Sequence, residues 1–154
     1  MFWSCFWQNE LGPLAAFPKG RVNSTKYCEI LENHLFPFYT AVKEVIEDEP
    51  MFMDDNTRVH TSAETMAFKD GLGIQMLEWP SQSPDLNPIE NLWKLWKDLI
   101  QKTDPSPTNH ETLIAAAQAA WEELKTTNIG QMLADSIKRC IAAVKAVKGS
   151  PTKY

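Results

Sequence analysis

The chain has 154 residues, of which 44% are hydrophobic and 23% are charged, and its formal net charge is −5 at pH 7. This length suffices for one domain with a hydrophobic core, and the composition excludes a disordered chain, a collagen-like chain and a repeat array. Residues 1–100 carry 8 basic and 15 acidic groups, whereas residues 101–154 carry 7 basic and 5 acidic groups. The first hundred residues therefore lack the basic footprint of a simple nucleic-acid-binding module.

The N-terminal pattern predicts two strands. Residues 1–7 are apolar, have no basic region before them and are too short for a signal peptide or a membrane span, so we expect a buried strand. Residues 14–17 predict a second strand, paired with the first as a hairpin whose turn at residues 8–13 contains Gly12 and Pro13. We expect neither a signal peptide nor membrane association.

A helix is predicted next, with Asn23 or Ser24 as its N-terminal cap. Its apolar side chains recur at helical spacing, at Tyr27, Ile30, Leu31 and Leu35. Pro37 is expected to interrupt this helix because proline lacks a backbone N–H and its ring clashes with the preceding turn. Residues 39–46 are then expected to form a second, short helix.

The middle of the chain predicts a strand, a helix and another strand. Residues 51–54 form a short predicted strand that ends in two acids. Ser62 is the predicted cap of a helix that closes at Gly71 or Gly73, and residues 74–79 predict the second strand.

Beyond this point the chain is predicted to be helical. Three prolines within residues 80–88 exclude regular structure there, and Pro88 suits the first position of a helix. The apolar face of that helix comprises Leu92, Trp93, Trp96, Leu99 and Ile100. A capping box at Thr108–Glu111 opens a helix that ends near Lys125, and a last helix covers residues 129–147. This order of elements predicts an α/β fold.

The cysteines are few and widely spaced. Cys5, Cys28 and Cys140 form no C-x-x-C pair. They indicate neither a disulfide framework nor a zinc ribbon, and they favour a reducing, intracellular environment.

Two segments of the sequence carry a family resemblance. Trp79–Trp93, with the sequence WPSQSPDLNPIENLW, resembles, nearly residue for residue, the signature around the last acid of mariner-like (Tc/mariner superfamily) DDE transposases. Met53–His60, with the sequence MDDNTRVH, is similar to the segment around the second acid of that family. Thirty-four residues separate Asp55 from Glu90, a spacing found in one branch of the family. Another acidic pair in the chain has the same spacing, so the assignment depends on the flanking sequence.

The resemblance extends over the whole chain, with several departures. Ser4 stands where the family commonly has Gly, Asp54 where Gln is common, and Thr57-Arg58 where Ala-Pro is frequent. The family's first Asp and its DNA-binding helix-turn-helix region lie upstream of residue 1. The resemblance therefore implies an N-terminally truncated catalytic domain whose first catalytic strand is missing, and we expect this chain alone to show no DNA cleavage.

The resemblance implies an RNase H-like fold, which is a mixed five-stranded sheet flanked by helices. It predicts a partial endonuclease domain over residues 1–102 and a helical C-terminal extension of the same domain over residues 103–154. It implies a parent enzyme that cuts and joins DNA, with transposon ends and target DNA as partners, a homodimer as the candidate assembly, and a nuclear location in a eukaryote. The alternative is a non-catalytic remnant that contacts DNA or another protein through the helical C-terminal third.

The resemblance also implies a metal site. Strand cleavage and transfer proceed by in-line attack at phosphorus, and two Mg²⁺ or Mn²⁺ ions about 3.5–4 Å apart can activate the attacking oxygen and stabilise the leaving one. By resemblance, Asp55 would bind both ions together with the missing Asp, and Glu90 would bind one of them. The accessory candidates are Asn56, His60 and Asn91.

Each candidate also has an ordinary structural interpretation. Asn87 and Glu90 fit a helix capping box, and Asp55 fits an Asx turn. Strand alternation turns Asp54 to the opposite face, where we expect it to be solvated, with substitution as a ligand as the alternative. His60 fits a histidine at the surface or the edge of the core. Packing is the ordinary role of Trp79, Trp93 and Trp96, and solvation that of Lys138, Arg139, Lys145 and Lys148, with phosphate contact as the alternative for the basic set.

Overall fold

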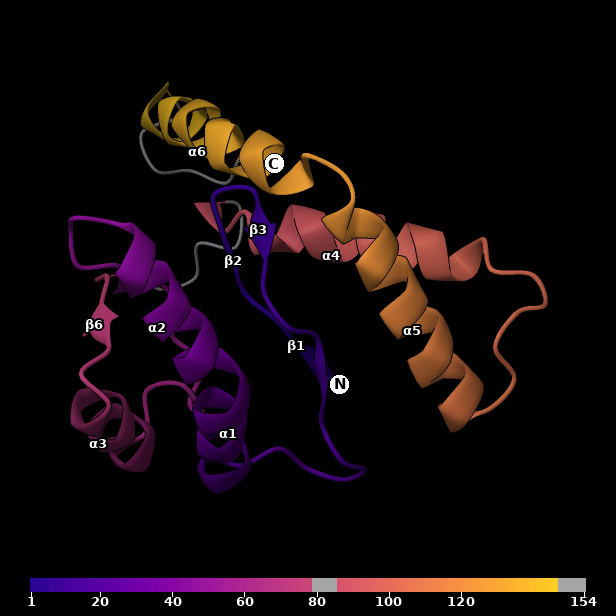
Figure 1. Ribbon diagram of the computed structural model, residues 1–154, viewed down its shortest axis with the longest axis horizontal. Coiled ribbons are helices and arrows are strands. Elements are labelled where there is room, and N and C mark those ends of the chain that lie inside the picture. The colour runs from indigo at the N-terminus through magenta and orange to yellow at the C-terminus, as the bar shows by residue number, and fades with distance from the viewer. Residues whose placement is uncertain (79–85, 147–154) are drawn as a thin grey trace. The chain divides into compact units, whose positions relative to one another are not determined.

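The computed structural model describes residues 1–78 and 86–146 (Figure 1). Within them, side chains are described for all residues except 138–140, 143 and 144. Both helices and strands are present, which confirms the predicted mixed α/β class. Within the described part of the chain, no helix combines the length and the apolar character needed to cross a membrane.

The chain divides into two units, each with its own core. The first unit comprises Met1–Cys5 and Ala15–Ser83. The second unit comprises Phe6–Leu14 and Pro84–Tyr154. The candidate ligand Asp55 therefore belongs to the first unit.

Two small sheets belong to the first unit. β1 (Phe2–Trp3) pairs with β4 (Ala15–Ala16) in antiparallel orientation, which confirms the pairing predicted for these segments. β5 (Met51–Phe52) pairs with β6 (Gln75–Met76) in parallel orientation. Parallel neighbours need a crossover connection, and α3 (Ala63–Gly71) provides it. The predicted strand–helix–strand order is thus confirmed, with shorter strands.

Both helix caps predicted in the first unit are confirmed. At the start of α1 (Ser24–Ile30), Asn23 Oδ1 accepts a hydrogen bond from the backbone N–H of Lys26 at 3.0 Å. At the start of α3, Ser62 Oγ accepts one from the backbone N–H of Thr65 at 3.2 Å. Each bond satisfies a backbone donor that has no partner within its own helix.

The prediction that Pro37 interrupts the first helix is wrong. α1 continues through a π-helical segment, η1 (Leu31–Leu35), into α2 (Phe36–Val45), and Figure 1 shows them as one continuous rod. In the π-helical turn, the backbone N–H of Phe36 bonds to the carbonyl oxygen of Leu31, five residues earlier. This wider turn lies directly before the proline and accommodates a residue that cannot continue the ordinary hydrogen-bond ladder.

The core of the first unit is built by helices and strands together. It comprises Trp3, Cys5, Ala15, Phe17, Tyr27, Ile30, Leu31, Leu35, Tyr39 and Ile74. Burial raises the pKa of Cys5 to about 12, so its thiol stays protonated at neutral pH. Cys5 and Cys28 are both buried, and neither forms a disulfide within the described residues.

The second unit begins with a tight hairpin. β2 (Phe6–Trp7) pairs with β3 (Glu10–Leu11) in antiparallel orientation. The tight turn is therefore at Gln8 and Asn9, with Gln8 at φ 49°, within the predicted connection at residues 8–13, but the short β2–β3 pairing inside that connection was not predicted. A two-residue hairpin turn needs positive φ, which explains the position of the reversal. The strands of the described residues form three two-stranded sheets, and the five-stranded RNase H-like sheet stays a prediction.

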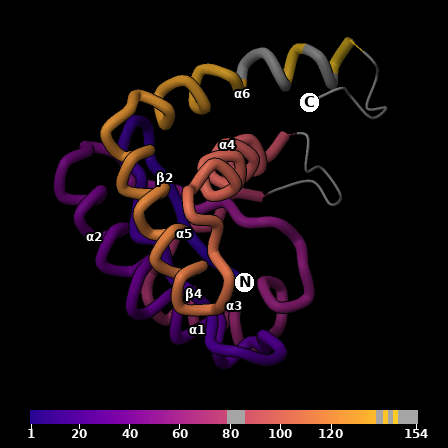
Figure 2. The backbone as a smooth tube through the Cα atoms, turned by 90° about the vertical axis from the view of Figure 1, so that its right-hand side faces the viewer, coloured from indigo at the N-terminus to yellow at the C-terminus, as the bar shows by residue number. Residues whose placement is uncertain are grey.

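Three helices complete the second unit. They are α4 (Ile89–Gln101), α5 (His110–Lys125) and α6 (Ile129–Ala146), which follow one another toward the C-terminus (Figure 2). The predicted end of α5 at Lys125 and the predicted start of α6 at residue 129 are confirmed.

Indole rings hold these helices to the hairpin. Trp121 is fully buried, and its Nε1–H donates to the carbonyl oxygen of Gly12 at 2.9 Å. Its ring centroid lies 5.7 Å from that of Trp93 and 6.5 Å from that of Trp96. Trp96 Nε1–H donates to the carbonyl oxygen of Ala117 at 2.8 Å. The predicted packing role of Trp93 and Trp96 is thus confirmed, whereas Trp79 lies outside the described residues.

The start of α6 approaches the hairpin turn very closely. A Cβ atom at Gly130 would overlap the backbone of Gln8 and Asn9. The backbone N–H of Gln131 lies 3.4 Å from Asn9 Oδ1. Glycine at position 130 thus permits the contact between α6 and the hairpin.

The capping box of α5 is present one residue from its predicted place. Asn109 Oδ1 accepts a hydrogen bond from the backbone N–H of Thr112 at 2.9 Å, and Thr112 Oγ1 accepts one from the backbone N–H of Asn109 at 3.1 Å. The sequence therefore predicted a capping box correctly, but placed it at Thr108–Glu111, one residue too early. The backbone N–H groups of Asn109 and Thr112, which have no partner within the helix, are both hydrogen-bonded in this way.

Asn109→Ala is expected to lower the free energy of unfolding by about 1 kcal/mol, because the Thr112 donor loses its acceptor. Urea unfolding followed by circular dichroism measures this change. Ser106→Ala, at an exposed loop position, is the control and should change stability by less than about 0.5 kcal/mol. Equal stability of the two variants would contradict a stabilising role for the cap.

Candidate carboxylate site

The strand that leads to Asp55 is fixed by one tyrosine. The Tyr39 hydroxyl donates a hydrogen bond to the carbonyl oxygen of Pro50 at 2.6 Å. The Tyr39 hydroxyl oxygen in turn accepts a hydrogen bond from the backbone N–H of Gln75 at 3.1 Å. Tyr39 lies on α2, so one buried phenol holds that helix to both β5 and β6. The segment that follows β5 therefore leaves from a fixed point.

Asp55 presents a half-exposed carboxylate. Its side chain is 50% exposed, and its Oδ1 accepts a hydrogen bond from the backbone N–H of Thr57 at 3.1 Å. This contact is the Asx turn that the sequence offered as the ordinary interpretation. Oδ1 also lies 2.7 Å from His60 Nδ1. The turn and the histidine together orient a carboxylate that a cation can reach from solvent.

The prediction that Asp54 is solvated is wrong. Its side chain is only 12% exposed, and its Oδ2 lies 2.6 Å from the Nζ of Lys69. The hydroxyl of Tyr27 donates to the same oxygen at 3.1 Å. Lys69 itself is 1% exposed, and a buried ammonium group requires a carboxylate close by. The Asp54 carboxylate therefore faces a buried cation rather than solvent.

His60 lies between the two acids. Its Nδ1 is 2.7 Å from Asp55 Oδ1 and 3.8 Å from Asp54 Oδ2. Its ring stacks on that of Tyr27, with centroids 4.3 Å apart and planes 26° from parallel. Lys69 Nζ donates to the carbonyl oxygen of His60 at 3.3 Å. His60 is thus at the edge of the core, and it also contacts the candidate ligand.

Tyr27 and Lys69 are members of this cluster that the sequence did not single out. Burial raises the pKa of Tyr27 well above its usual range, and the nearby Asp54 carboxylate raises it further, so the phenol stays a donor. Lys69 had a detectable signal, because it lies four residues after Thr65 on the buried face of α3. A lysine on the buried face of a helix predicts a carboxylate partner elsewhere in the chain.

Glu90 belongs to the second unit. It is the second residue of α4, and its side chain is exposed. The predicted capping box with Asn87 is not formed, because Asn87 Oδ1 accepts from the backbone N–H of Ile89 at 3.3 Å instead. Asn91 is exposed beside Glu90, and Asn56 is exposed beside Asp55 in the first unit. The convergence of Asp55 and Glu90 on one site stays a prediction.

The predicted basic face of α6 is described only in part. Lys145 is exposed, as expected for a solvated residue. The side chains of Lys138, Arg139 and Lys148 lie outside the described residues, as does the first part of the family signature, residues 79–85.

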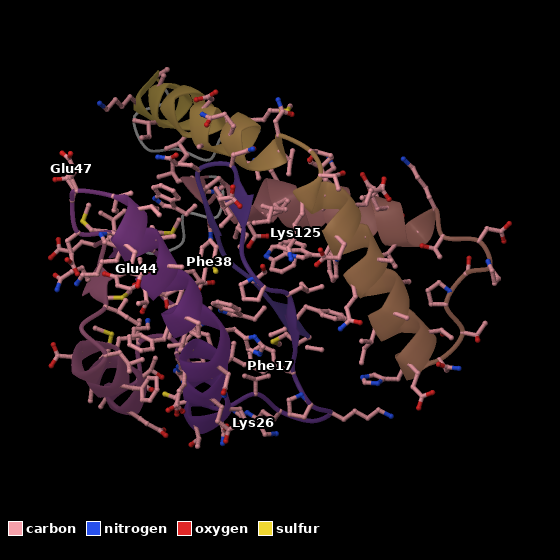
Figure 3. All side chains as sticks on the ribbon, in the orientation of Figure 1. Phe17, Lys26, Phe38, Glu44, Glu47 and Lys125 are labelled. Atoms are coloured by element: carbon pink, nitrogen blue, oxygen red, sulfur yellow. The ribbon has the colours of Figure 1, made fainter. Side chains whose placement is uncertain are left out.

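The segment before β5 is acidic. Figure 3 shows Glu44 on α2 and Glu47 just beyond its end, and both are exposed. Asp48 and Glu49 continue this acidic run. The negative charges of these side chains repel the phosphates of DNA, so this end of the first unit is not expected to contact a nucleic acid.

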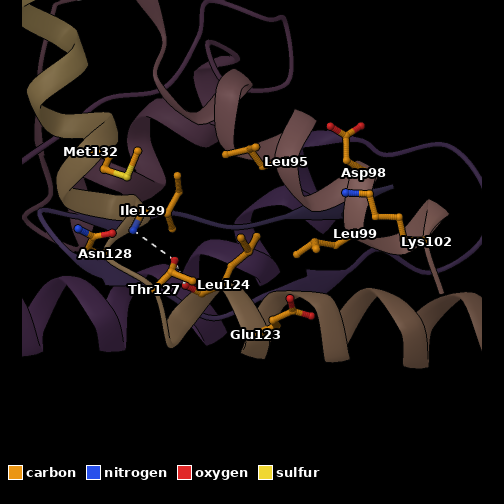
Figure 4. Close-up of a pocket in the computed structure, with 10 residues that line it drawn as sticks. All are labelled: Leu95, Asp98, Leu99, Lys102, Glu123, Leu124, Thr127, Asn128, Ile129 and Met132. Atoms are coloured by element: carbon orange, nitrogen blue, oxygen red, sulfur yellow. Dashed lines mark hydrogen bonds between the residues drawn. The ribbon is translucent and has the colours of Figure 1, made fainter.

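A cavity of about 320 Å³ lies within the second unit, away from Glu90. Figure 4 shows its apolar lining, which includes Leu95, Leu99, Leu124, Ile129 and Met132. The backbone N–H of Ile129 donates to Thr127 Oγ1 at 3.3 Å at its edge. Asp98, Lys102 and Glu123 also line it, and neither candidate acid is among its lining residues.

The candidate ligands fit a hard divalent cation only as separate parts. In the described portions of the chain, no group of three or more His, Cys, Asp or Glu side chains could hold a metal ion. Asp55 and Glu90 each offer exposed carboxylate oxygen, which is the donor that Mg²⁺ and Mn²⁺ prefer. The donor chemistry of each acid, taken by itself, therefore fits such a cation.

Comparisons with known proteins match the whole chain. A family model described as DDE superfamily endonuclease matches residues 8–114. The Tcb1 transposase of a Caenorhabditis briggsae transposable element is 35% identical over 154 residues, which are 100% of this chain and 54% of the relative. The Tcb2 transposase of the same organism is 32% identical over 158 residues, and the Tc1 transposase of Caenorhabditis elegans is 30% identical over 154 residues, with the same coverage. The chain thus spans about half the length of these curated relatives.

Proposed function

The chain belongs to the DDE superfamily of endonucleases, and from this premise we propose that it is part of a transposase that cuts and joins DNA with divalent metal ions. DDE superfamily endonucleases generally use divalent metals. The observation that carries the proposal is the family match over residues 8–114, which includes both candidate acids with their flanking signatures. The names of the relatives, all transposases, support the same reaction class.

Asp55 and Glu90 are the proposed ligands. Bound Mg²⁺ or Mn²⁺ ions, two in a complete site, supply the charge that activates an attacking oxygen and stabilises a leaving one. The Nδ1–H of His60 donates to the Asp55 carboxylate and so fixes the rotamer of that side chain. Asn56 and Asn91 are the proposed accessory groups beside the two acids.

The finer family features are part of this proposal. The fold is proposed to be RNase H-like, with an endonuclease domain over residues 1–102 and its helical extension over residues 103–154. The proposed partners are transposon ends, target DNA and a second copy of the protein, in the nucleus of a eukaryotic cell. Family membership and the two acid-bearing segments support these features.

A chimera tests the function directly. The matched half of the Caenorhabditis elegans Tc1 transposase is replaced by residues 1–154, because the relative then supplies the rest of the protein. We expect the chimera to excise a transposon from a plasmid. Asp55→Asn or Glu90→Gln should reduce excision about a hundredfold or more, because several kcal/mol of transition-state stabilisation by the metal would be lost.

The chain offers a matched control for each acid. Glu111 is the exposed second residue of α5, as Glu90 is of α4, and Asp48 is an exposed aspartate near β5. Glu111→Gln and Asp48→Asn should leave excision within about twofold of the parent chimera. Undiminished excision by the Asp55 or Glu90 variant would exclude that residue as a ligand. A cooperatively folded but inactive chimera would favour the non-catalytic alternative.

A further inference from the structure

Two consecutive acids at the candidate site have opposite environments. The side chain of Asp55 is 50% exposed, whereas that of Asp54 is 12% exposed. Asp54 faces Lys69, whose side chain is 1% exposed. Sequence alone leaves open which of the two carboxylates would bind a cation, and the packing of Lys69 separates them.

We propose that Lys69 is a positioning residue that makes Asp55, rather than Asp54, the carboxylate available to a divalent cation. The inference rests on the proposed function, in which the acid after β5 is a metal ligand. Lys69 acts in two ways, by occupying Asp54 and by fixing the loop that presents Asp55.

The first effect is occupation. Lys69 Nζ lies 2.6 Å from Asp54 Oδ2, and the Tyr27 hydroxyl donates to the same oxygen. A metal ion at this oxygen would have to approach an ammonium group at contact distance, and the two positive charges would repel strongly in a poorly solvated environment. The Lys69 side chain has no room to leave, because it is buried and its Nζ lies 5.9 Å and 5.7 Å from the ring centroids of Tyr27 and Phe52.

The second effect is fixation of the loop. Lys69 Nζ also donates to the carbonyl oxygen of His60 at 3.3 Å, so one ammonium group contacts both ends of residues 54–60. Between these two points, His60 Nδ1 reaches Asp55 Oδ1 at 2.7 Å. The loop held in this way presents Asp55 outward while its neighbour stays inside.

Paramagnetic broadening by Mn²⁺ tests the proposal on the complete 154-residue chain. The imidazole signals of His60 report binding at the adjacent acid, and those of His34 and His110 are internal references in the same spectrum. Mg²⁺ provides the diamagnetic control. In the wild type, low Mn²⁺ should broaden His60 selectively, and Asp55→Asn should weaken the apparent affinity about tenfold or more.

The decisive variants change which of the two carboxylates has no ammonium partner. In Lys69→Met, Asp54 is released, so broadening of His60 should survive the additional change Asp55→Asn. Lys69→Met/Asp54→Asn removes both charges together and also the bond from Lys69 to the carbonyl oxygen of His60. Broadening should then still depend on Asp55, but the apparent affinity should fall about tenfold because the loop loses its anchor. Lys69→Arg should behave as wild type because the cation is retained. The neutral double variant tests the proposal even if Lys69→Met fails to fold.

The outcomes separate the two proposals. If Lys69→Met/Asp55→Asn loses broadening as completely as Asp55→Asn, or if the neutral double variant binds Mn²⁺ as tightly as the wild type, Lys69 does not position the ligand and the metal role of Asp55 stands. If wild-type His60 is not broadened, or if Asp55→Asn leaves the broadening intact, Asp55 does not bind the cation in this chain and the inference fails, whereas the excision chimera decides the proposed function separately.

Discussion

Trp121→Ala is expected to lower the free energy of unfolding by about 3–5 kcal/mol, the largest effect of any single truncation in the second unit. Trp121 is fully buried and contacts the rings of both Trp93 and Trp96. Its removal leaves a cavity among α4 and α5, and the carbonyl oxygen of Gly12 loses its donor.

Denaturant unfolding followed by tryptophan fluorescence and circular dichroism measures this loss. Gln118→Ala, on the exposed face of the same helix, is the control and should change stability by less than about 0.5 kcal/mol. Trp121→Phe keeps most of the apolar volume and removes the hydrogen bond, so it should fall between the two. A loss below about 1 kcal/mol for Trp121→Ala would show that the indole cluster does not form the core of this unit.

Lys69→Met is expected to lower the free energy of unfolding by about 3 kcal/mol, because it strands the mostly buried carboxylate of Asp54 without its cation. Asp54→Asn should cost a similar amount by stranding the ammonium group. Replacing both at once removes the unpaired charge, so Lys69→Met/Asp54→Asn should recover most of the loss. The expected signature is a double-mutant cycle with a large coupling free energy.

An exposed ion pair of the same unit provides the matched control. Lys43 pairs with Glu49, and their side chains are 52% and 43% exposed. Lys43→Met should therefore change the free energy of unfolding far less than Lys69→Met, because solvent screens the pair. Additive effects of the Lys69 and Asp54 substitutions would mean that the two groups do not interact in solution.

Local chemistry explains why much of the fold was predictable. Asn23 and Ser62 cap helices because their side chains accept bonds from nearby backbone donors, and such bonds depend only on neighbouring residues. The same reasoning placed the end of α5 at Lys125. This local reasoning failed at Pro37. A helix can accommodate a proline in several ways, and the π-helical turn found here is one of them.

Only the features of the candidate site that depend on neighbouring residues in the sequence could be predicted. The flanking residues identified Asp55 and Glu90, and the Asx turn at Asp55 follows from the short reach of an aspartate. The environment of Asp54 depends on Lys69, fifteen residues later on another element, and strand alternation gives only the direction of a side chain. The partner that the side chain meets in that direction depends on tertiary packing. The convergence of Asp55 and Glu90 depends on packing in the same way and stays a prediction.

The extra residue in the π-helical segment has a consequence for insertions and deletions. Tyr27 and Tyr39 lie on either side of Leu31–Leu35, and their hydroxyls bond to Asp54 and to the carbonyl oxygen of Pro50. The continuous helix formed by α1, η1 and α2 thus holds both ends of the segment that leads to the candidate ligand. Deleting one residue from Leu31–Leu35 would rotate one tyrosine by about 100° relative to the other and release one end of that segment. This segment should therefore tolerate substitutions far better than changes in length.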